Sequence, residues 1–171
     1  TITQEELIEK CGDVGRQFRS RISIGEEKMV LMGIDYGAKT DAEQLANPDK
    51  ARSGQSYTTA VILTAKGPNL LSVEYAKKFQ RNDIEGKKGI IDQLVRQYSV
   101  DLMVGDIGFS HDFSTMLHTA YGDKYLVSRA VGTVNKHVRY RDDIFPKEIQ
   151  FERNYYIEEM FDMLKAGQVR F

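Results

Sequence analysis

The chain has 171 residues, which fits one domain, since single hydrophobic cores usually comprise about 100–200 residues. With 41% hydrophobic residues, 29% charged residues and only three prolines, the composition excludes a disordered or collagen-like chain. The 24 basic and 25 acidic residues give a net charge of -1, so no overall field attracts nucleic acid or anionic lipid. Binding to either therefore requires a local basic patch.

The sequence predicts a soluble, intracellular protein without membrane contact. Its single cysteine, Cys11, excludes an internal disulfide, and the N-terminus lacks the charged-then-apolar pattern of a secretion signal. The longest apolar run, Val30 to Ile34, is far shorter than the roughly 20 residues of a membrane span. Because the chain opens at Thr1 rather than Met and ends in the strand-like sequence 168–171, we expect a piece of a longer polypeptide.

The first half of the chain predicts a helix, a buried strand and a hairpin. Thr3 and Glu6 form a capping box for a short helix ending near Cys11, so residues 1–27 are expected to be a lead-in helix and linker. The apolar run 28–35 is typical of a central strand buried on both faces. A polar stretch over 38–55 predicts a long loop. The β-branched run 56–65, a turn at 66–69 and strand-like alternation over 70–79 then predict an antiparallel hairpin.

The second half alternates helices with strands. Asn82 is the expected cap of a helix with an apolar face that extends to Tyr98, and residues 100–104 predict a short buried strand. Ser110 is expected to cap a helix that Gly122 ends. Strands follow over 124–131 and 148–152, and Asn154 is expected to cap a last helix ending before Gly167. This order predicts an α/β fold in which helices pack on the faces of a mixed sheet.

Two aspartates stand at the ends of apolar strands. Asp35 ends the first buried strand and Asp106 the fourth, and each is followed two residues later by a glycine. A carboxylate in such a place costs several kcal/mol unless it is paired or bound to metal, so the two suggest a shared cation. Oxygen ligands favour Mg²⁺ or Mn²⁺ over zinc. The alternative is that each aspartate only caps the turn or helix that follows, and the shared site requires that the two strands be neighbours.

Several segments together resemble a known family. They are residues 32–37 (MGIDYG), 56–59 (SYTT) and 104–112 (VGDIGFSHD), followed by Tyr121 and Gly122. They resemble the C-terminal nuclease domain of the large terminase subunit of tailed double-stranded DNA viruses, over about residues 28–171. The resemblance implies an RNase H-like fold, a mixed β-sheet flanked by helices, and endonuclease cutting of concatemeric genomic DNA with two Mg²⁺ or Mn²⁺ ions. It further implies an upstream ATPase domain, the small terminase subunit and the portal of the procapsid as partners, and a location in the host cell cytoplasm.

The same resemblance assigns roles to the acids. The family's first metal-binding aspartate falls on Asp35, our expected bridging ligand because two-metal hydrolysis needs one carboxylate shared by both ions, and the second falls on Asp106. The family's third acid lies on a further helix, after a helix and strand that resemble 154–171, so it is expected beyond Phe171 unless another carboxylate substitutes. Glu158, Glu159 and Asp162 could substitute for it, because their spacing places them along one helix, although charges on the outer face of a helix are usually only solvated. Asp142 and Asp143 are no better candidates for the third ligand.

Two nearby residues could support the acids. His111 and Asp112 follow Asp106 closely and could hold a metal ligand or a water in position, whereas the alternative for Asp112 is that it only stabilises a helix N-terminus. His118 is expected to be a packing or surface histidine.

A basic segment is the candidate DNA-binding region. Alternation over 136–141 predicts a strand with Lys136, Val138 and Tyr140 on one face and His137, Arg139 and Arg141 on the other. Lys136, Arg139 and Arg141 are the expected contacts to double-stranded DNA, because the family has a DNA-contacting hairpin near this point. Asp142 and Asp143 could instead neutralise this row. A second basic cluster is expected to be solvated surface: Lys77, Lys78, Arg81, Lys87 and Lys88.

Two other functions stay open at this stage. Nucleotide-binding proteins of the actin and sugar-kinase type also use Asp-x-Gly turns to hold Mg²⁺ and phosphate, although they need two such domains and this chain has no P-loop motif. A DNA-gripping module of a packaging motor that lacks nuclease activity is the second alternative. Tight ATP binding would indicate the first, and metal-dependent cleavage would exclude the second.

Overall fold

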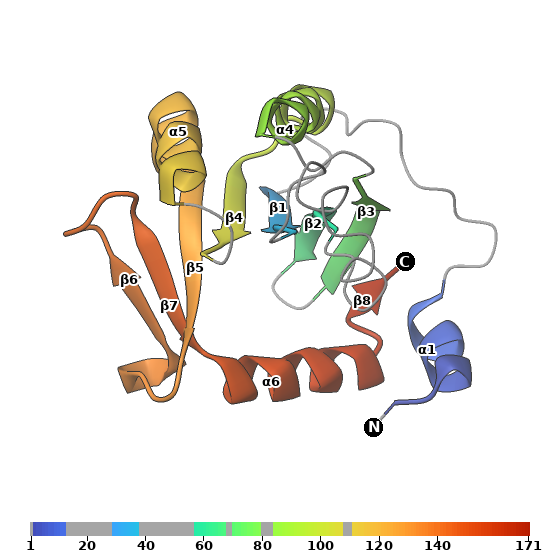
Figure 1. Ribbon diagram of the computed structural model, residues 1–171. Coiled ribbons are helices and arrows are strands. Elements are labelled where there is room, and N and C mark those ends of the chain that lie inside the picture. Colours follow the sequence, from blue (N-terminus) through green and yellow to red (C-terminus); the bar gives the residue numbers. More distant parts are fainter. Residues whose placement is uncertain (1, 13–28, 38–56, 68–69, 80–83, 108–110) are drawn as a thin grey trace, which may run out of the picture.

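The protein is an α/β fold in which one mixed sheet separates helices on its two sides (Figure 1). The computed structural model describes residues 2–12, 29–37, 57–67, 70–79, 84–107 and 111–171. The expected loop at 38–55, the caps Asn82 and Ser110, and Arg81 lie outside these residues. This architecture confirms the predicted RNase H-like mixed sheet flanked by helices.

In the described ranges, eight strands form the sheet in the order β6-β7-β5-β4-β1-β2-β3-β8. Their bounds are β1 Met29–Asp35, β2 Thr59–Gly67, β3 Leu70–Lys78, β4 Leu102–Asp106, β5 Tyr125–Val131, β6 Val138–Arg141, β7 Glu148–Glu152 and β8 Val169–Arg170. The hairpin of β2 and β3 is antiparallel as predicted, and β1 runs antiparallel to β2 but parallel to β4. The parallel run continues through β5 to β7. The sheet is therefore mixed, and β1 lies at the change of direction.

One face of the sheet is closed by helices α4 (Ile84–Tyr98) and α5 (His111–Tyr121), which lie side by side in Figure 1. Alternate residues of β1, Val30, Met32 and Ile34, join Ile91 and Leu117 of these helices in the core. The intervening residues Gly33 and Asp35 are exposed. The expectation that this strand is buried on both faces is therefore wrong: β1 has one buried face and one open face. We call the side of the sheet opposite α4 and α5 the open face.

Helix α6 (Arg153–Lys165) runs along the other side, from the end of β7 to the start of β8 (Figure 1). Helix α1 (Gln4–Cys11), with the predicted Thr3–Glu6 capping box, packs against its C-terminal end. The Cys11 thiol donates to the Leu164 carbonyl, and the Phe171 amide donates to the Cys11 carbonyl. The two ends of the described chain are thus held together. No helix among the described residues has the length and apolar character of a membrane span.

Several boundaries differ from the sequence prediction; β2, for example, spans Thr59–Gly67 rather than 56–65. Strand β4 begins at Leu102 rather than residue 100; α4 ends at Tyr98, and Ser99 after it is left-handed, with φ of 52°. Helix α6 begins at Arg153 with Glu152 as its N-cap, which places Asn154 inside the helix. The strand expected from residue 136 begins only at Val138, since Lys136 and His137 lie in a short 3₁₀ turn, Asn135–His137, with φ above 60°.

Asp101 fixes how β1 and β4 are aligned. Its carboxylate accepts a hydrogen bond of 2.8 Å from the Val30 amide, and its own amide donates one of 2.9 Å to the Val30 carbonyl. Two bonds between the same two residues, just before the strands pair, define the starting point of the parallel ladder. The register that follows pairs Leu31 with Leu102.

We predict that Asp101→Ala lowers the free energy of unfolding by about 1 kcal/mol, because the Val30 amide loses its acceptor. Asp101→Asn, which keeps a side-chain oxygen, is expected to lose less. Urea unfolding followed by circular dichroism measures both. If both substitutions lower the free energy of unfolding equally, the charge of the Asp101 carboxylate, and not its hydrogen bond, stabilises the start of the β1–β4 ladder.

Candidate active site

The two strand-end aspartates lie opposite each other. The register of β1 and β4 pairs Gly33 with Val104 and Ile34 with Gly105, so the next step places Asp35 opposite Asp106. Paired residues of parallel neighbours present their side chains on the same face, here the open face. The strands are about 4.8 Å apart, which is the spacing at which two carboxylates can share one cation. The condition that the two strands be neighbours is therefore met.

Cross-strand partners extend this pair into a row across the open face, all of them polar except Ile149. Asp35 pairs with Thr59 of β2, and Asp106 pairs with Ser128 of β5. Beyond Thr59 the row reaches Lys78 on β3. Beyond Ser128 it continues through Ile149 of β7 to Tyr140 of β6. We call these residues the acid row: Lys78, Thr59, Asp35, Asp106, Ser128, Ile149 and Tyr140.

A buried pair of tyrosines lies behind the acids. The hydroxyl groups of Tyr36 and Tyr125 are 3.2 Å apart, and the Tyr125 hydroxyl also lies 3.4 Å from the Ser114 hydroxyl. Burial raises the pKa of both tyrosines, and the negative charge of Asp106 raises them further. Both phenols therefore stay neutral and keep their protons for hydrogen bonding beneath the carboxylates.

Gly105 makes this arrangement possible. A Cβ atom at this position would lie 2.6 Å from the Tyr125 hydroxyl oxygen and 2.7 Å from that of Tyr36. Real Cβ atoms do not approach so closely, so any other residue would push the tyrosine pair apart. The glycine before Asp106 in the sequence is thus explained by packing against the rings behind the acid.

The turn after Asp35 is held from two sides. The Gly37 amide donates to the Thr58 hydroxyl at 3.1 Å, and the ammonium group of Lys87 donates to the Gly37 carbonyl at 3.2 Å. Lys87 is fully buried, so the expectation that it belongs to a solvated basic surface is wrong. The sequence contained the signal, because Lys87 shares its helical face with Ile91, Leu94 and Tyr98.

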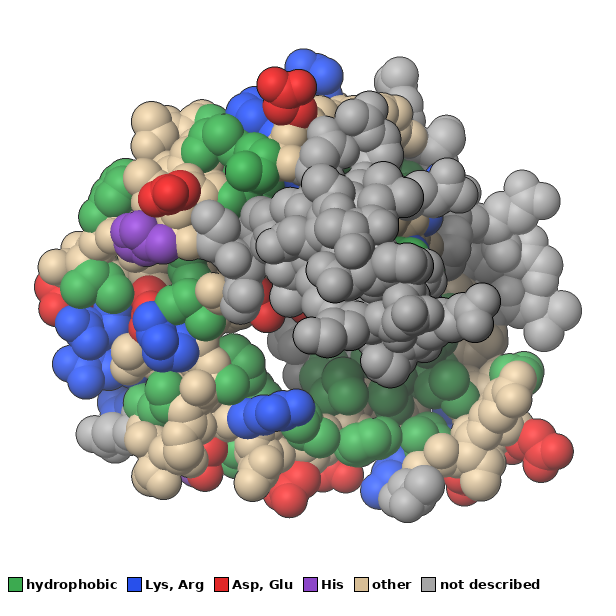
Figure 2. Space-filling model, viewed as in Figure 1, with side chains coloured by type: hydrophobic (Ala, Val, Ile, Leu, Met, Phe, Trp, Pro, Cys, Tyr) green, Lys and Arg blue, Asp and Glu red, His purple; other side chains and the backbone are tan. Residues whose placement is uncertain are grey.

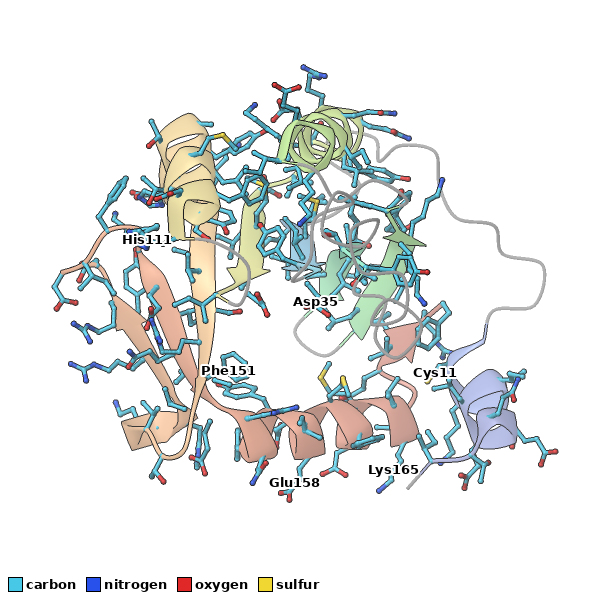
Figure 3. All side chains as sticks on the ribbon, in the orientation of Figure 1. Cys11, Asp35, His111, Phe151, Glu158 and Lys165 are labelled. Atoms are coloured by element: carbon cyan, nitrogen blue, oxygen red, sulfur yellow. The ribbon has the colours of Figure 1, made fainter. Side chains whose placement is uncertain are left out.

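The proposed supporting residues lie elsewhere. His111 lines a cavity of about 100 Å³ on the α5 side of the sheet, together with Ser114, Arg129 and Glu148. In Figure 3 it is well separated from Asp35. Asp112 is exposed in the first turn of α5. No contact in the described part of the chain joins either residue to the acids. His118 is a packing histidine, as expected: it is buried and its Nδ1 lies 2.9 Å from the Tyr125 carbonyl.

The candidate third acids on α6 do not join the pair. Glu158 points away from the sheet in Figure 3. Glu159 is exposed and raises the pKa of the neighbouring Tyr155, while Asp162 is exposed and lies 3.9 Å from Lys165. Within the described ranges, no group of three His, Cys, Asp or Glu side chains is placed to hold a metal.

The structure separates the three predicted DNA-binding residues. Lys136 lies in the 3₁₀ turn, outside the strand. Arg139 and Arg141 lie on one face of β6 as predicted, opposite Gln150 and Glu148 of β7. That face is the α5 side, because Glu148 pairs with the core residue Val127. The two arginines thus face away from the acid row.

Arg141 and Arg139 also differ in charge environment. Asp143 binds Arg141 through two hydrogen bonds of 2.6 and 2.7 Å, and this contact lowers the pKa of Asp143 to about 2. The expected alternative, neutralisation by a neighbouring aspartate, therefore holds for Arg141. Arg139 has no ion-pair partner among the described residues.

Comparisons with known proteins identify no family. A scan against protein-family models finds no match to the chain, and a search of curated proteins finds no similar sequence.

We predict that Gly105→Ala destabilises the fold by about 1–3 kcal/mol, because the new methyl group overlaps both tyrosine hydroxyls. Gly33→Ala is the matched control, since a Cβ there meets nothing within 4 Å. Adding Tyr125→Phe to Gly105→Ala should restore part of the loss by removing one of the overlapping oxygens. Thermal and urea unfolding compare the four proteins. A Gly105→Ala protein as stable as Gly33→Ala would contradict this packing.

Proposed function

We propose that the chain is a metal-dependent DNA nuclease domain whose acids are Asp35 and Asp106. The observation that carries this proposal is the register of β1 and β4, which sets the two carboxylates side by side at the ends of adjacent parallel strands. Two like charges so close repel one another, and a divalent cation between them removes that cost. The hydroxyl groups of Thr59 and Ser128 flank the pair and offer further oxygen atoms.

The donor set suits Mg²⁺ or Mn²⁺. Carboxylate and hydroxyl oxygens are the hard ligands these ions prefer, and both ions keep several water molecules when bound through one or two carboxylates. When bound, such ions lower the pKa of a water that attacks phosphorus and stabilise the leaving 3′ oxygen. Asp35, on the strand where the sheet changes direction, and Asp106 would hold these ions, with Asp35 as the proposed shared ligand.

The surrounding residues hold these carboxylates in place. The Tyr36 and Tyr125 hydroxyls pack behind Gly105, and Lys87 with Thr58 holds the turn after Asp35. Such buried supports reduce the reorganisation that a reaction requires of its ligands. The third acid of a two-metal site is assigned to no described residue.

The resemblance to terminase nuclease domains extends the proposal to a biological role. In that role the domain cuts concatemeric double-stranded DNA during virus packaging in the host cell, beside an ATPase domain, the small terminase subunit and the portal. Binding to any duplex would rely on phosphate contacts, since the net charge is near zero and a packaging cut needs little base readout.

We predict that Asp35→Asn and Asp106→Asn each abolish Mg²⁺- or Mn²⁺-dependent cleavage of plasmid DNA while the fold persists. Either substitution removes a repelling charge, so the melting temperature without metal should stay equal or rise. Gel analysis of plasmid nicking and thermal unfolding measure the two effects.

Asp112→Asn and Glu158→Gln are the matched controls, because these acids are exposed and no described contact joins them to the pair. Both should cut at the wild-type rate. Wild-type cleavage by Asp35→Asn or Asp106→Asn would refute the assignment.

We predict that Arg139→Ala weakens binding to duplex DNA more than Arg141→Ala. Arg139 lies on the edge strand of the sheet without an ion-pair partner in the described chain, whereas Arg141 is held by Asp143. Removing one phosphate contact should reduce the salt slope of binding by about 1 and act equally on unrelated sequences. Titrations of two duplexes at several salt concentrations test this. Equal effects of the two substitutions would show that Asp143 does not withdraw Arg141 from DNA.

A further inference from the structure

An exposed aromatic patch lies on the open face, the same face of the sheet as the acids. Tyr140 of β6 is 50% exposed, and Val138, two residues earlier on the same face, is 38% exposed. Val138 pairs with Phe151 of β7, whose ring packs edge-on against Tyr156 of α6. Tyr156 itself is 38% exposed. We call Val138, Tyr140, Phe151 and Tyr156 the aromatic patch.

The patch is continuous with the acid row. Asp106, Ser128, Ile149 and Tyr140 are successive partners across β4, β5, β7 and β6. Three steps of about 4.8 Å place Tyr140 about 14 Å from Asp106 along the sheet. A polymer that lies across the strands and passes over the acids therefore reaches the Tyr140 ring about 14 Å further on.

Positive charge borders the patch. Arg153 begins α6 two residues after Phe151, and Lys136 lies in the turn just before β6. Neither has an ion-pair partner among the described residues. Two of the nearby acids are already engaged: Glu152 by His137 at 2.9 Å, and Asp143 by Arg141. Figure 2 shows Lys and Arg side chains beside hydrophobic ones over β6 and the start of α6.

We propose that the aromatic patch binds unpaired bases of a DNA strand, with the Tyr140 ring as the stacking surface. Exposed aromatic rings bordered by cations are the combination that holds single-stranded nucleic acid, because every base has a face to stack and every nucleotide a phosphate to neutralise. A protein partner would use the hydrophobic area equally well but would leave the two cations without a role. This inference deepens the proposed nuclease function by naming its substrate class: DNA with an unpaired segment next to the cut.

The test measures binding without metal, so that it does not depend on cleavage. Fluorescence anisotropy of a labelled oligothymidylate of about 20 nucleotides, and of a duplex of equal length, is followed in EDTA with the chain 1–171. Tyr140→Ala should weaken single-strand binding about tenfold and duplex binding less than about twofold. Tyr140→Phe keeps the ring and should bind like the wild type.

Phe171→Ala is the matched control, because Phe171 is a 40% exposed aromatic residue outside the patch, next to β8. It should leave single-strand binding unchanged. Circular dichroism verifies that Tyr140→Ala, a change at an exposed position on an edge strand, keeps the fold. Undiminished single-strand binding by Tyr140→Ala, or an equal loss in Tyr140→Phe, would overturn the stacking role. A wild-type chain that binds no single strand would overturn the proposal as well and leave the patch to a protein partner.

The two proposals fail separately. If Asp35→Asn abolishes cleavage while Tyr140→Ala binds single strands normally, the nuclease assignment stands and the stacking role falls. If Tyr140→Ala loses single-strand binding but the wild type cuts no DNA with either metal, the patch stands and the nuclease assignment falls.

Discussion

The site depends first on the alignment of β1 with β4. Side-chain direction alternates along a strand, so a slip of one residue would carry Asp106 to the face that α4 and α5 bury. The paired hydrogen bonds between Val30 and Asp101 prevent that slip at the start of the ladder. Asp35 and Asp106 each stand five residues further on, so the same alignment that starts the ladder ends it with two carboxylates side by side. An acidic residue outside the site thus determines the geometry within it.

The packing behind the acids also matters, because the charged carboxylates of Asp35 and Asp106 lie at the edge of an apolar core. Gly105 leaves room for two tyrosine hydroxyls, and burial keeps both neutral by raising their pKa. The buried ammonium group of Lys87 bonds to the turn after Asp35, on the same side of the core. Hydrogen-bond donors therefore lie inside, while the carboxylates remain on the open face, where solvent or a metal ion can reach them.

Hydrophobic periodicity was sufficient to predict most of the fold, because burial against α4 and α5 imposes period 2 on the strands and period 3.6 on the helices. The hairpin, the two covering helices and the strand-end position of both aspartates followed from it. It could not predict partners that are distant in sequence. The clustering of lysines suggested that Lys87 is solvated, although its helical face indicated burial, and closeness in sequence suggested that His111 lies near Asp106; packing buries the lysine and places His111 at a cavity on the α5 side. The third acid had no signal of this kind, since helix spacing does not say which side of α6 meets the sheet.

The basic segment shows why a strand must be assigned to a face before its residues are assigned a role. Arg139 and Arg141 have the charge expected for DNA contacts, yet the pairing of Glu148 with Val127 turns both toward α5. Tyr140, between them and uncharged, lies on the face of the acids. The two arginines can contact a DNA duplex only if it passes around the edge strand β6. A DNA single strand that crosses the open face instead meets Tyr140. Because side chains alternate along β6, its arginines are placed to contact phosphates at the edge of the sheet, and Tyr140 is placed to stack with bases on the open face.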